Sequence, residues 1–535
     1  MKYIEGFHRL QLILYPEKLD DLVSDNNPVR FLDAFVDHLD LALMGFGKTN
    51  LEINLAGRPC YSPKSLLKLF IYGYFKKIRT SRKLMEICNT NIEVMWLIER
   101  LTPDFRTISD FRKDNAEAII GVFKEFVKMC TSMGLYNTEI GVQDGSKFRA
   151  YNSKDNNVTE SKLQKKLEIV EKRIREYLEE MDKNDEEESD PQQYTKEEIE
   201  EKIKMLQERK EKYNSIINTM KEEGVTQQSF TDPESRLMKT ANGGFDVCYN
   251  AQIIVDPVSH MIGAIEVTNN CNDMGLLTPV TTKFKEELGV DVMEVVADKG
   301  YEEPKDMLEC ILNGTIPHVP SKTGKESYEF EVEYKEASIN DEMLDSTSSA
   351  DIRTCLEAGV KPNVYKDMGI EVSIKEEEQY VSGDESTGSC FKLNEAGTAV
   401  ICPNSASLNK VARMHNKERT RFTSKSACKL CTDKCTTSKF KQIDLKDGQT
   451  MLYIKKHQVV KKVIIKLMPN KEKIRNRKTV VEHPFGTIKR WLDGSYVLLK
   501  GKKKAAADLA LSFLAYNVKR LITMVGVPTI MEKMS

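Results

Sequence analysis

Residues 475–491, RNRKTVVEHPFGTIKRW, place a single acid, Glu482, among several cations. Glu482 and Lys489 lie two helical turns apart, so a helix would present both on one side. A carboxylate among cations suits a site that binds a divalent metal ion and handles phosphates. An exposed helix with one glutamate among many fits this stretch equally well. Apolar residues at helical spacing could face a core: Val481, Phe485, Ile488 and Leu492.

The residues around Glu482 also bear on where its helix begins. Pro484 and Gly486 disfavour a helix interior, so the sequence predicts a helix that starts near Glu482 or is kinked there. Cations dominate residues 455–504, in the runs KKHQVVKK, KEKIRNRK and KGKKKAAAD. Such runs favour either a track for DNA phosphates or a solvated face.

A second acid, Asp144, lies in TEIGVQDGSKFRAYNS. Alternating residues give this stretch the period of a strand, with Asp144 on the same face as the apolar Val142. An acid in that position costs free energy unless it is paired or binds a cation. An aspartate that opens a turn with Gly145 is the alternative.

A third acid, Asp298, follows a predicted buried strand over 292–297 in MEVVADKGYEE. Open α/β sheets place ligands at the carboxyl ends of strands, although a loop aspartate would read the same way. The order of strands and helices lets Asp144, Asp298 and Glu482 converge at one end of a mixed sheet. Carboxylates there could hold Mg²⁺ or Mn²⁺, and two such ions about 4 Å apart support polynucleotide cleavage and transfer.

Length and composition predict several domains in a reducing cytoplasm. The chain has 535 residues, a net charge of -2 and 12 cysteines. The balanced charge excludes a uniformly basic nucleic-acid coat but allows local basic surfaces. We see neither a signal peptide nor an apolar run of the roughly 20 residues that a membrane helix needs, so we expect no membrane partner.

The first 135 residues read as an all-α domain that could bind DNA ends. A cluster of cations, which includes Lys76, Lys77, Arg79 and Arg82, lies between two helical segments. That arrangement fits either a helix-turn-helix DNA reader or ordinary helical packing with a solvated basic turn. In the following TPDFRTISDFR, Thr107 or Ser109 is predicted to cap a helix.

Two insertions interrupt the sheet pattern. Residues 156–225 carry apolar residues at steps of three and four on both sides of an acidic break, which predicts a helical hairpin with a coiled-coil seam. Residues 302–470 are too long for a loop, and their middle is acidic and weakly patterned. Their distal part has four cysteines whose spacing suits a zinc-ribbon-like domain, with reduced, unliganded thiols as the alternative. These cysteines are Cys402, Cys428, Cys431 and Cys435.

Several separate segments resemble the DDE transposases of bacterial insertion sequences, in that family's order. They are QDGSKFRAYNS, TDPESRLMKTANGGFDVCYNAQ, VVADKGYEE and RNRKTVVEHPFGTIKRW, together with YSPKSLLKLFIYGYF, TPDFRTISDFR and LSFLAYNVKRL. The resemblance implies an α/β fold, with an RNase H-like mixed sheet built from residues 136–155, 226–301 and 471–530. It also implies that Asp144, Asp298 and Glu482 form a catalytic metal triad.

Relatives carry a tyrosine, an arginine, the glutamate and a lysine around the third acid, and this chain departs from that signature. Lys489 matches the lysine, but Lys478 stands in place of the arginine and Arg475 in place of the tyrosine. Asn250 and Gln252 lie in the family's strand motif, where they could support the site or be polar residues of a sheet face. The cations expected to contact DNA are Lys489, Arg490, Lys478, Arg477, Arg475, Lys76, Lys77, Arg79 and Arg82.

The resemblance further implies the substrate and the assembly. The expected substrates are double-stranded terminal inverted repeats and target DNA, bound by a homodimer in a paired-end complex in the bacterial cytoplasm, associated with the nucleoid. Physical reasoning alone supports only a metal-dependent nuclease. A domesticated DNA-binding protein without catalysis and a nuclease without strand transfer are therefore the alternatives.

Overall fold

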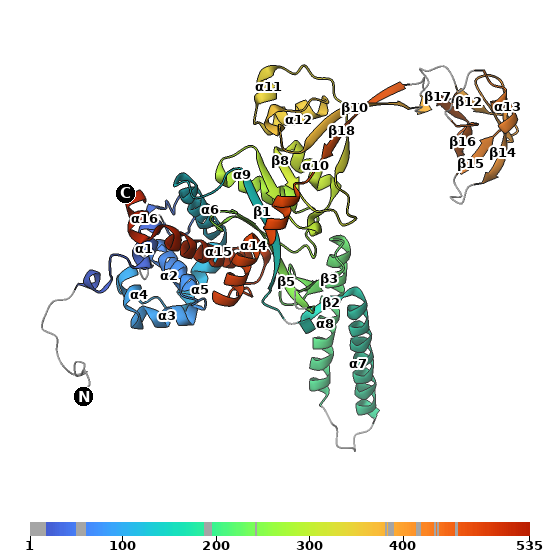
Figure 1. Ribbon diagram of the computed structural model, residues 1–535. Helices are drawn as coiled ribbons and strands as arrows, with labels where there is room; N and C mark the ends of the chain where they lie inside the picture. The colour runs from blue at the N-terminus through green and yellow to red at the C-terminus, as the bar shows by residue number, and fades with distance from the viewer. Residues whose placement is uncertain are drawn as a thin grey trace. The chain divides into compact units, whose positions relative to one another are not determined.

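The computed structural model divides into two compact units, which are described separately (Figure 1). Unit 1 comprises residues 1–326, 347–349 and 469–535, and unit 2 comprises residues 327–346 and 350–468. Most of the acidic break of the predicted hairpin, from residue 187 onward, and Lys455 fall outside the described residues. The structure describes residues 18–49, 60–152, 154–186, 195–240, 243–379, 382–383, 390–413, 419–432, 435, 438–454 and 458–534.

The N-terminal part of unit 1 is helical. Asn27 and Ser62 cap α1 and α2, and each is followed by a proline in the first helical turn. Asp104 caps α5 by accepting from two backbone amides, so the prediction of Thr107 or Ser109 as the cap was wrong. The elements are η1 (Leu19–Leu22), α1 (Pro28–His38), α2 (Pro63–Phe75), α3 (Ser81–Thr90), α4 (Ile92–Leu97), α5 (Phe105–Asp114) and α6 (Ala116–Ser132).

A mixed sheet of six strands forms the centre of unit 1, in the order β4-β5-β1-β7-β8, with β6 paired to β5. Strands β1 and β7 are parallel, whereas β5 runs antiparallel to β1, β4 and β6. Fully buried apolar residues of β5 and β7 explain the stability of this centre. The strands are β1 (Ile140–Arg149), β4 (Arg236–Lys239), β5 (Phe245–Val255), β6 (Ile262–Thr268), β7 (Met293–Val296) and β8 (Thr315–His318).

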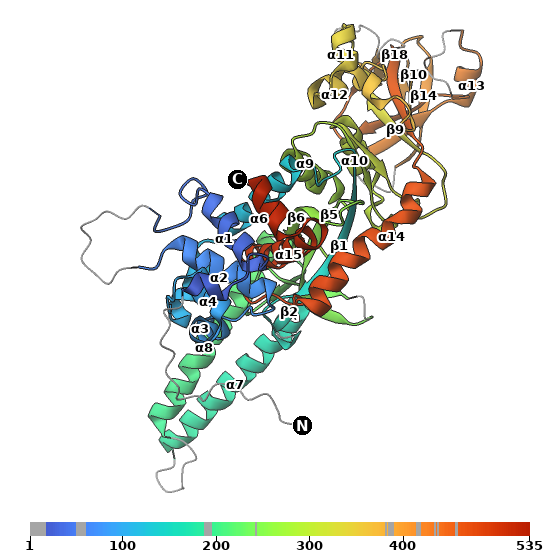
Figure 2. The same cartoon turned by 60° about the vertical axis from the view of Figure 1, so that its left-hand side comes forward.

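Helices cover both faces of this sheet. Gly141 of β1 leaves room for Phe284 of α9, which packs on one face, and Phe148 of β1 contacts Phe485 of α14 on the other. In Figure 2, α14 runs alongside β1. The N-terminal helices share this core, because α2 and α6 pack against α15. The remaining elements of the layer are α9 (Leu277–Leu288), η3 (Lys299–Tyr301), α10 (Pro304–Leu312), α14 (Lys471–Gly486), α15 (Lys502–Val525) and α16 (Val527–Met534).

Helix α14 begins at Lys471, so the alternative of a helix that starts near Glu482 was wrong. Asn470 caps it by accepting from the amides of Glu472 and Lys473, and the helix continues past Glu482 with Pro484 inside. A π-helical turn, Thr487–Trp491, follows directly. π-Turns are frequent at functional sites, and this one sets the direction of Lys489.

A helical hairpin extends from the sheet of unit 1. Helices α7 (Glu160–Glu186) and α8 (Lys196–Glu222) lie side by side in both views (Figures 1 and 2), and Lys210 pairs with Glu171 at 2.8 Å. A two-stranded sheet of β2 (Asn157–Thr159) and β3 (Gln227–Ser229), preceded by η2 (Lys154–Asn156), closes the base of the hairpin. A small apolar cluster around Val158 and Leu163 joins strands and helices.

Unit 2 contains two antiparallel sheets. In the first, lysines of β18 pair with glutamates of its neighbours, for example Lys462 with Glu331 at 2.9 Å and Glu377 at 3.4 Å. Part of the cationic run after residue 455 is therefore neutralised within the sheet. This sheet has β10 (Ile370–Gln379), β18 (Gln458–Leu467) and β9 (Tyr328–Glu333), accompanied by α11 (Asp341–Asp345), α12 (Ser349–Glu357) and η4 (Asn363–Tyr365).

The second sheet of unit 2 has seven strands around a small core that includes Phe391 and Phe422. Its strands are β11 (Ser382–Gly383), β17 (Met451–Ile454), β12 (Cys390–Leu393), β13 (Ala399–Ile401), β14 (Ser407–Arg413), β15 (Arg419–Thr423) and β16 (Gln442–Lys446), and α13 spans Lys425–Lys429. Across the described residues no single helix is long and apolar enough to cross a membrane. The pair α15 and α16, bent by 99°, meets that requirement jointly, by length and composition only.

Candidate active site

The register of the two parallel strands brings Asp144 and Asp298 to the same end of the sheet. Val142 of β1 is opposite Val296 of β7, and each aspartate lies two residues further along its strand direction. Both acids therefore lie at corresponding positions where parallel pairing ends. Carboxyl ends of neighbouring parallel strands are where α/β sheets place their ligands.

Each of these two aspartates has one oxygen held by a backbone amide. Gly145 N donates to Asp144 Oδ1 at 2.9 Å, and Gly300 N donates to Asp298 Oδ1 at 2.6 Å. Asp298 thereby caps the short helix η3. The second oxygen of Asp144 meets a cation, because Arg477 Nη1 of α14 lies 3.6 Å from Oδ2.

Burial changes the acidity of Asp144. Loss of hydration raises the pKa of Asp144 to about 6, and the nearby charges of Asp298 and Asp273 act in the same direction. Arg477 and the amide of Gly145 oppose the rise without cancelling it. A carboxylate that is costly to ionise in place is a good candidate for binding a cation, which would stabilise its charged form.

Lys489 approaches the same face of β1 from the π-helical turn. Its Nζ donates to Ser146 Oγ at 2.6 Å and to the carbonyl of Lys147 at 2.8 Å, and it lies 4.6 Å from the centre of the Phe148 ring. Burial lowers the pKa of Lys489 to about 8, and Lys147 nearby adds to the effect. Ser146 shares the strand face of Asp144, so Lys489 and Arg477 lie along one side of that acid.

Glu482 does not join the two aspartates in the structure. Its side chain is 66% exposed, and its ion pair is with Lys478, one turn earlier on α14, at 3.6 Å. Arg477 and Glu482 are separated by about 140° around the helix axis, so when Arg477 faces Asp144 the glutamate points elsewhere. The early start of α14 and its π-helical end fix this rotation.

A third carboxylate near the two aspartates belongs to Asp273, which the sequence analysis did not single out. It lies in the loop between β6 and α9, and its Oδ1 accepts from Asn250 Nδ2 and Gln252 Nε2, both at 2.8 Å, and from Lys147 Nζ at 3.3 Å. Asn250 and Gln252 are fully buried, so the strand-motif amides support this acid. The only hint in the sequence is an acid in the polar loop NNCND that follows a buried strand.

The buried Tyr301 links this polar layer to the Asp298 turn. Its hydroxyl donates to Gln252 Oε1, and burial raises the Tyr301 pKa well above its usual value, with further increases from Asp273, Asp144 and Asp298.

A glycine is required at position 145, because a β-carbon there would lie 2.1 Å from Gln252 Nε2 and 2.8 Å from Asp273 Oδ1.

The described side chains do not form a ready-made metal cage. No group of three or more histidine, cysteine or acidic side chains in the described ranges is close enough to hold a metal ion. The donor set at the strand ends nevertheless suits a hard divalent cation, since two carboxylates each keep an oxygen that no backbone amide holds.

Two family models match the chain. A transposase domain matches residues 17–114, and a transposase DDE domain matches residues 401–522. The two matches support a DDE transposase of insertion-sequence type. A transposase DDE domain implies an enzyme that cleaves and transfers DNA. Glu482 and Lys489 fall inside the second match, and Asp144 and Asp298 fall outside both.

No curated protein and no solved structure matches this transposase. The evidence for its family therefore comes from the two matched segments. These segments include the N-terminal helices α1 to α5, the distal part of unit 2, and α14 with most of α15.

The basic cluster between α2 and α3 of the transposase is divided between surface and interior. Arg79 is 3% exposed, and it pairs with Asp508 of α15 at 2.9 Å and donates to the Tyr496 carbonyl at 2.7 Å. Its guanidinium is thus used inside unit 1, which corrects the expectation that it meets DNA. Lys77 lies over the ring of Trp491 at 5.5 Å, and Trp491 is 67% exposed.

The other candidate DNA contacts differ in accessibility. Lys76 is partly exposed and pairs with Glu93 at 2.9 Å, whereas the exposed Arg82 lies 4.9 Å from the Phe105 ring. On α14 and its π-helical turn, Arg475 and Arg490 are exposed, as is Lys478. Arg477 and Lys489 are less accessible: 16% of the Arg477 side chain is exposed, and Lys489 is partly buried.

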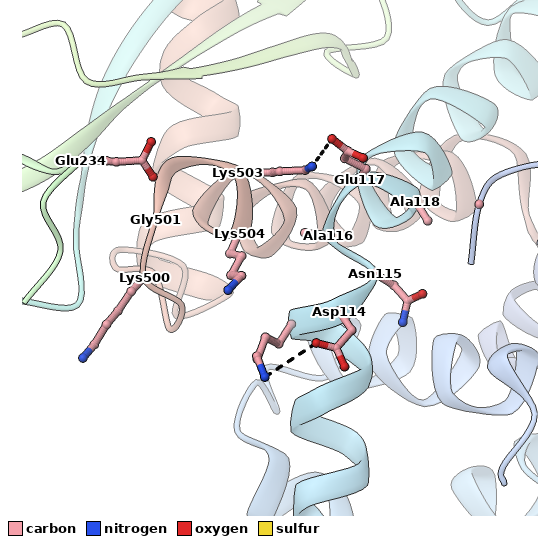
Figure 3. A pocket seen from close by; sticks show the side chains of 12 residues that line it. Asp114, Asn115, Ala116, Glu117, Ala118, Glu234, Lys500, Gly501, Lys503 and Lys504 are labelled. Carbon is pink, nitrogen blue, oxygen red and sulfur yellow. Dashed lines mark ion pairs between the residues drawn. The ribbon is translucent and has the colours of Figure 1, made fainter. Parts of the chain in front are cut away.

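A pocket at the start of α15 also gathers lysines, among them Lys500, Lys503 and Lys504 (Figure 3). Lys503 pairs with Glu117, and the first amide of α15 is already used, since Lys502 N donates to Glu234 Oε2 at 2.7 Å. This amide is therefore not free to bind a phosphate. The pocket does not include Asp144 or Asp298.

The four cysteines of the predicted zinc site lie in the seven-stranded sheet region of unit 2. Hydrogen-bond donors point at three of the sulfurs: Ala406 N at Cys402 (3.3 Å), Lys441 N at Cys428 (3.4 Å) and Asn404 Nδ2 at Cys431 (3.5 Å). Burial raises the pKa of Cys435, with smaller contributions from Cys428 and Cys431, so these thiols are neighbours. All four are free thiols.

Proposed function

We propose that the chain binds the ends of an insertion sequence and catalyses metal-dependent strand cleavage and strand transfer. The observation that carries this proposal is the pairing of Asp144 and Asp298 at corresponding ends of two parallel strands, with Arg477 and Lys489 beside Asp144. Acids that bind divalent cations and cations that bind phosphates are the two requirements of phosphodiester chemistry.

The carboxylates of Asp144 and Asp298 would hold Mg²⁺ or Mn²⁺, two ions in the proposal, which supply charge stabilisation and an activated oxygen nucleophile. The protein contributes the positions. Backbone amides of Gly145 and Gly300 fix one oxygen of each acid. Lys489 and the exposed cations of α14 hold the phosphates of the DNA strand. First a water and then the released 3′-hydroxyl would be directed at a phosphorus atom in line with the leaving oxygen.

Glu482 is proposed as the third acid on the basis of the family motif. Its carboxylate lies on the exposed side of α14, so this role requires α14 to turn or its π-helical end to rearrange when DNA binds. Glu482→Gln decides the question. Loss of cleavage with intact end binding places Glu482 in the site, and wild-type cleavage removes it.

The fold and assembly of the proposed enzyme follow the same resemblance. The mixed sheet of unit 1 would be the RNase H-like catalytic core, with residues 156–225 and 302–470 as insertions and residues 1–135 as the end-binding domain. Double-stranded terminal inverted repeats and target DNA would be its substrates, and a homodimer would hold the paired ends. In bacteria this places the protein in the cytoplasm with the nucleoid.

Zinc is proposed for Cys402, Cys428, Cys431 and Cys435. The spacing of the four cysteines and the donors directed at three of the sulfurs support zinc, although the side chains do not already form a closed site. Metal analysis of protein purified without added zinc tests this. About one zinc per chain, lost in a Cys428→Ser and Cys431→Ser variant, is expected, and a zinc-free, fully folded wild type overturns it.

The decisive experiment uses the DNA that flanks the gene. Labelled ends are incubated with the protein and Mg²⁺ or Mn²⁺, beside Asp298→Asn as the inactive control. Wild type should yield 3′-hydroxyl ends and joined products, and the variant neither. Cleavage without joining would make the protein a nuclease, and binding without cleavage in either metal would make it a DNA-binding relative.

A further inference from the structure

One cation beside Asp144 has an unused donor. Arg477 Nη1 is shielded from solvent and finds no hydrogen-bond acceptor in the part of the chain that the structure describes. Its nearest charged partner, Asp144 Oδ2, is 3.6 Å away, which is an ion pair but too long for a hydrogen bond. Leaving a buried N–H of a charged group without an acceptor costs free energy, so its retention calls for an explanation.

The phase of α14 makes Arg477 different from its neighbours. Lys473, one turn earlier, pairs with Glu294 at 2.6 Å, and Phe485, two turns later, packs on Phe148, so this face of α14 lies against the sheet. Arg477 lies on the same face, whereas the adjacent Lys478 is 76% exposed. Lys478 occupies the place of the family's arginine in sequence, but the guanidinium that reaches the acids is that of Arg477.

We propose that Arg477 binds the phosphate at which the DNA strand is cut, donating its free N–H to a non-bridging oxygen. The inference rests on the proposed function and deepens it, because it assigns the group that contacts the reacting phosphate. Two cations would then flank that phosphate, Arg477 beside Asp144 and Lys489 at Ser146.

A guanidinium suits this role better than an ammonium. Its planar fork of donors matches the oxygens of a phosphate, and its charge does not depend on pH in the working range. Charge grows on the non-bridging oxygens as the phosphorus is attacked, so a guanidinium held beside the acids stabilises that state once the bound strand has displaced the atoms that shield it. The loose contact with Asp144 keeps the donor in position without consuming it.

The test measures single-turnover cleavage and end binding separately, with Arg477→Gln, Arg477→Lys and, as a control that also removes one positive charge, the exposed Lys128→Gln on α6. Binding is measured with Ca²⁺ in place of the catalytic metal. We expect Arg477→Gln to lower the cleavage rate about 100- to 1,000-fold, while the Kd for the ends changes less than about fivefold. Arg477→Lys should fall between wild type and Arg477→Gln, and Lys128→Gln should cleave within about threefold of wild type.

A neutral methylphosphonate at the cut position shows whether the contact is direct. If Arg477 touches this phosphate, the modification slows wild type strongly but adds little to the defect of Arg477→Gln. Three results overturn the inference: cleavage by Arg477→Gln within threefold of wild type, an equal methylphosphonate penalty in both proteins, or full recovery of Arg477→Gln at high Mn²⁺, which would mean that Arg477 only supports Asp144. A wild type that cuts no DNA refutes the proposed function instead.

Discussion

Two aspartates of unit 1, the fully buried Asp508 and the partly buried Asp144, meet arginines with opposite results. Asp508 is fully buried, and Arg79, Arg112, Tyr74 and the amide of Leu498 all donate to it. Burial alone would raise its pKa, but the two arginines hold the Asp508 pKa below the usual value. Asp144 has one arginine at 3.6 Å and one amide, and its pKa rises to about 6.

The difference lies in how many donors each carboxylate receives. Around Asp508 the donors saturate the oxygens, so the group joins α15 to the N-terminal helices and offers nothing to a ligand. Around Asp144 the oxygens are underused, which is unfavourable for stability but leaves them available to a cation. The same residue types thus serve structure in one place and, under the proposed function, chemistry in the other.

The largest expected effect comes from breaking the saturated cluster. Asp508→Asn leaves Arg79 and Arg112 buried without a counter-charge and should lower the free energy of unfolding by about 3–5 kcal/mol. Urea denaturation measures it. The control is Asp37→Asn, whose exposed pairs with Lys68 and Lys64 should contribute less than about 1 kcal/mol. Equal losses in the two variants would contradict the comparison.

A second, smaller effect tests the crowding beside Asp144. Gly145→Ala places a β-carbon against Gln252 Nε2 and Asp273 Oδ1, so we expect a loss of about 1–3 kcal/mol and weaker cleavage. Gly486→Ala is the matched control, because a β-carbon there meets nothing within 4 Å and alanine favours a helix. Thermal denaturation and end cleavage compare them, and a neutral Gly145→Ala would show that the polar layer is loosely packed.

The sequence predicted where Asp144 and Asp298 lie on their strands, because both positions depend on local patterns and on the order of strands. The alternation of residue types along β1 assigned the face of Asp144. The parallel pairing of β1 with β7 brings Asp298 to the corresponding position at the same end of the sheet. The orientation of Glu482 could not be predicted, since it depends on the cap at Asn470 and the π-helical turn after Gly486. A one-residue change in helix phase moves a side chain by about 100°.

Residues whose roles depend on distant partners were also missed. Arg79 lies in a basic run that resembles a DNA-binding surface, yet its partner Asp508 is 429 positions away in sequence. Asp273 belongs to no periodic segment, and its importance comes from amides on β5. Local patterns therefore identify acids on strands, whereas pairing across the fold decides which charges are buried.

Glu294 of β7, which pairs with Lys473 near the start of α14, gives a pH-dependent test of the comparison between Asp508 and Asp144. His318 and Lys473 both donate to Glu294, and although burial alone would raise its pKa, these bonds lower the Glu294 pKa to about 2. A lowered folded pKa stabilises the fold above the unfolded value of about 4.5 and loses that contribution as pH falls toward 2. Glu294→Gln should cost about 2 kcal/mol at pH 7 and progressively less below pH 4.5.

Chemical denaturation across pH 3 to 7 checks this prediction. The control is Glu326→Gln, because both side chains of the ion pair between Glu326 and Lys471 are exposed to solvent. A cost of Glu294→Gln that stays constant over this pH range would mean that packing, rather than the charge of Glu294, holds α14 to β7 and β8.

The smallest expected change is at Asp144 itself, and its sign completes the comparison. Since burial raises the Asp144 pKa to about 6, the ionised group opposes folding at pH 7, and a neutral amide of the same shape removes that cost. Asp144→Asn should therefore unfold at the same or slightly higher denaturant concentration, by up to about 1 kcal/mol, in EDTA, while abolishing cleavage. A stability loss comparable to that of Asp508→Asn would mean that Asp144, too, is a structural acid, because only a carboxylate that the fold depends on is costly to neutralise.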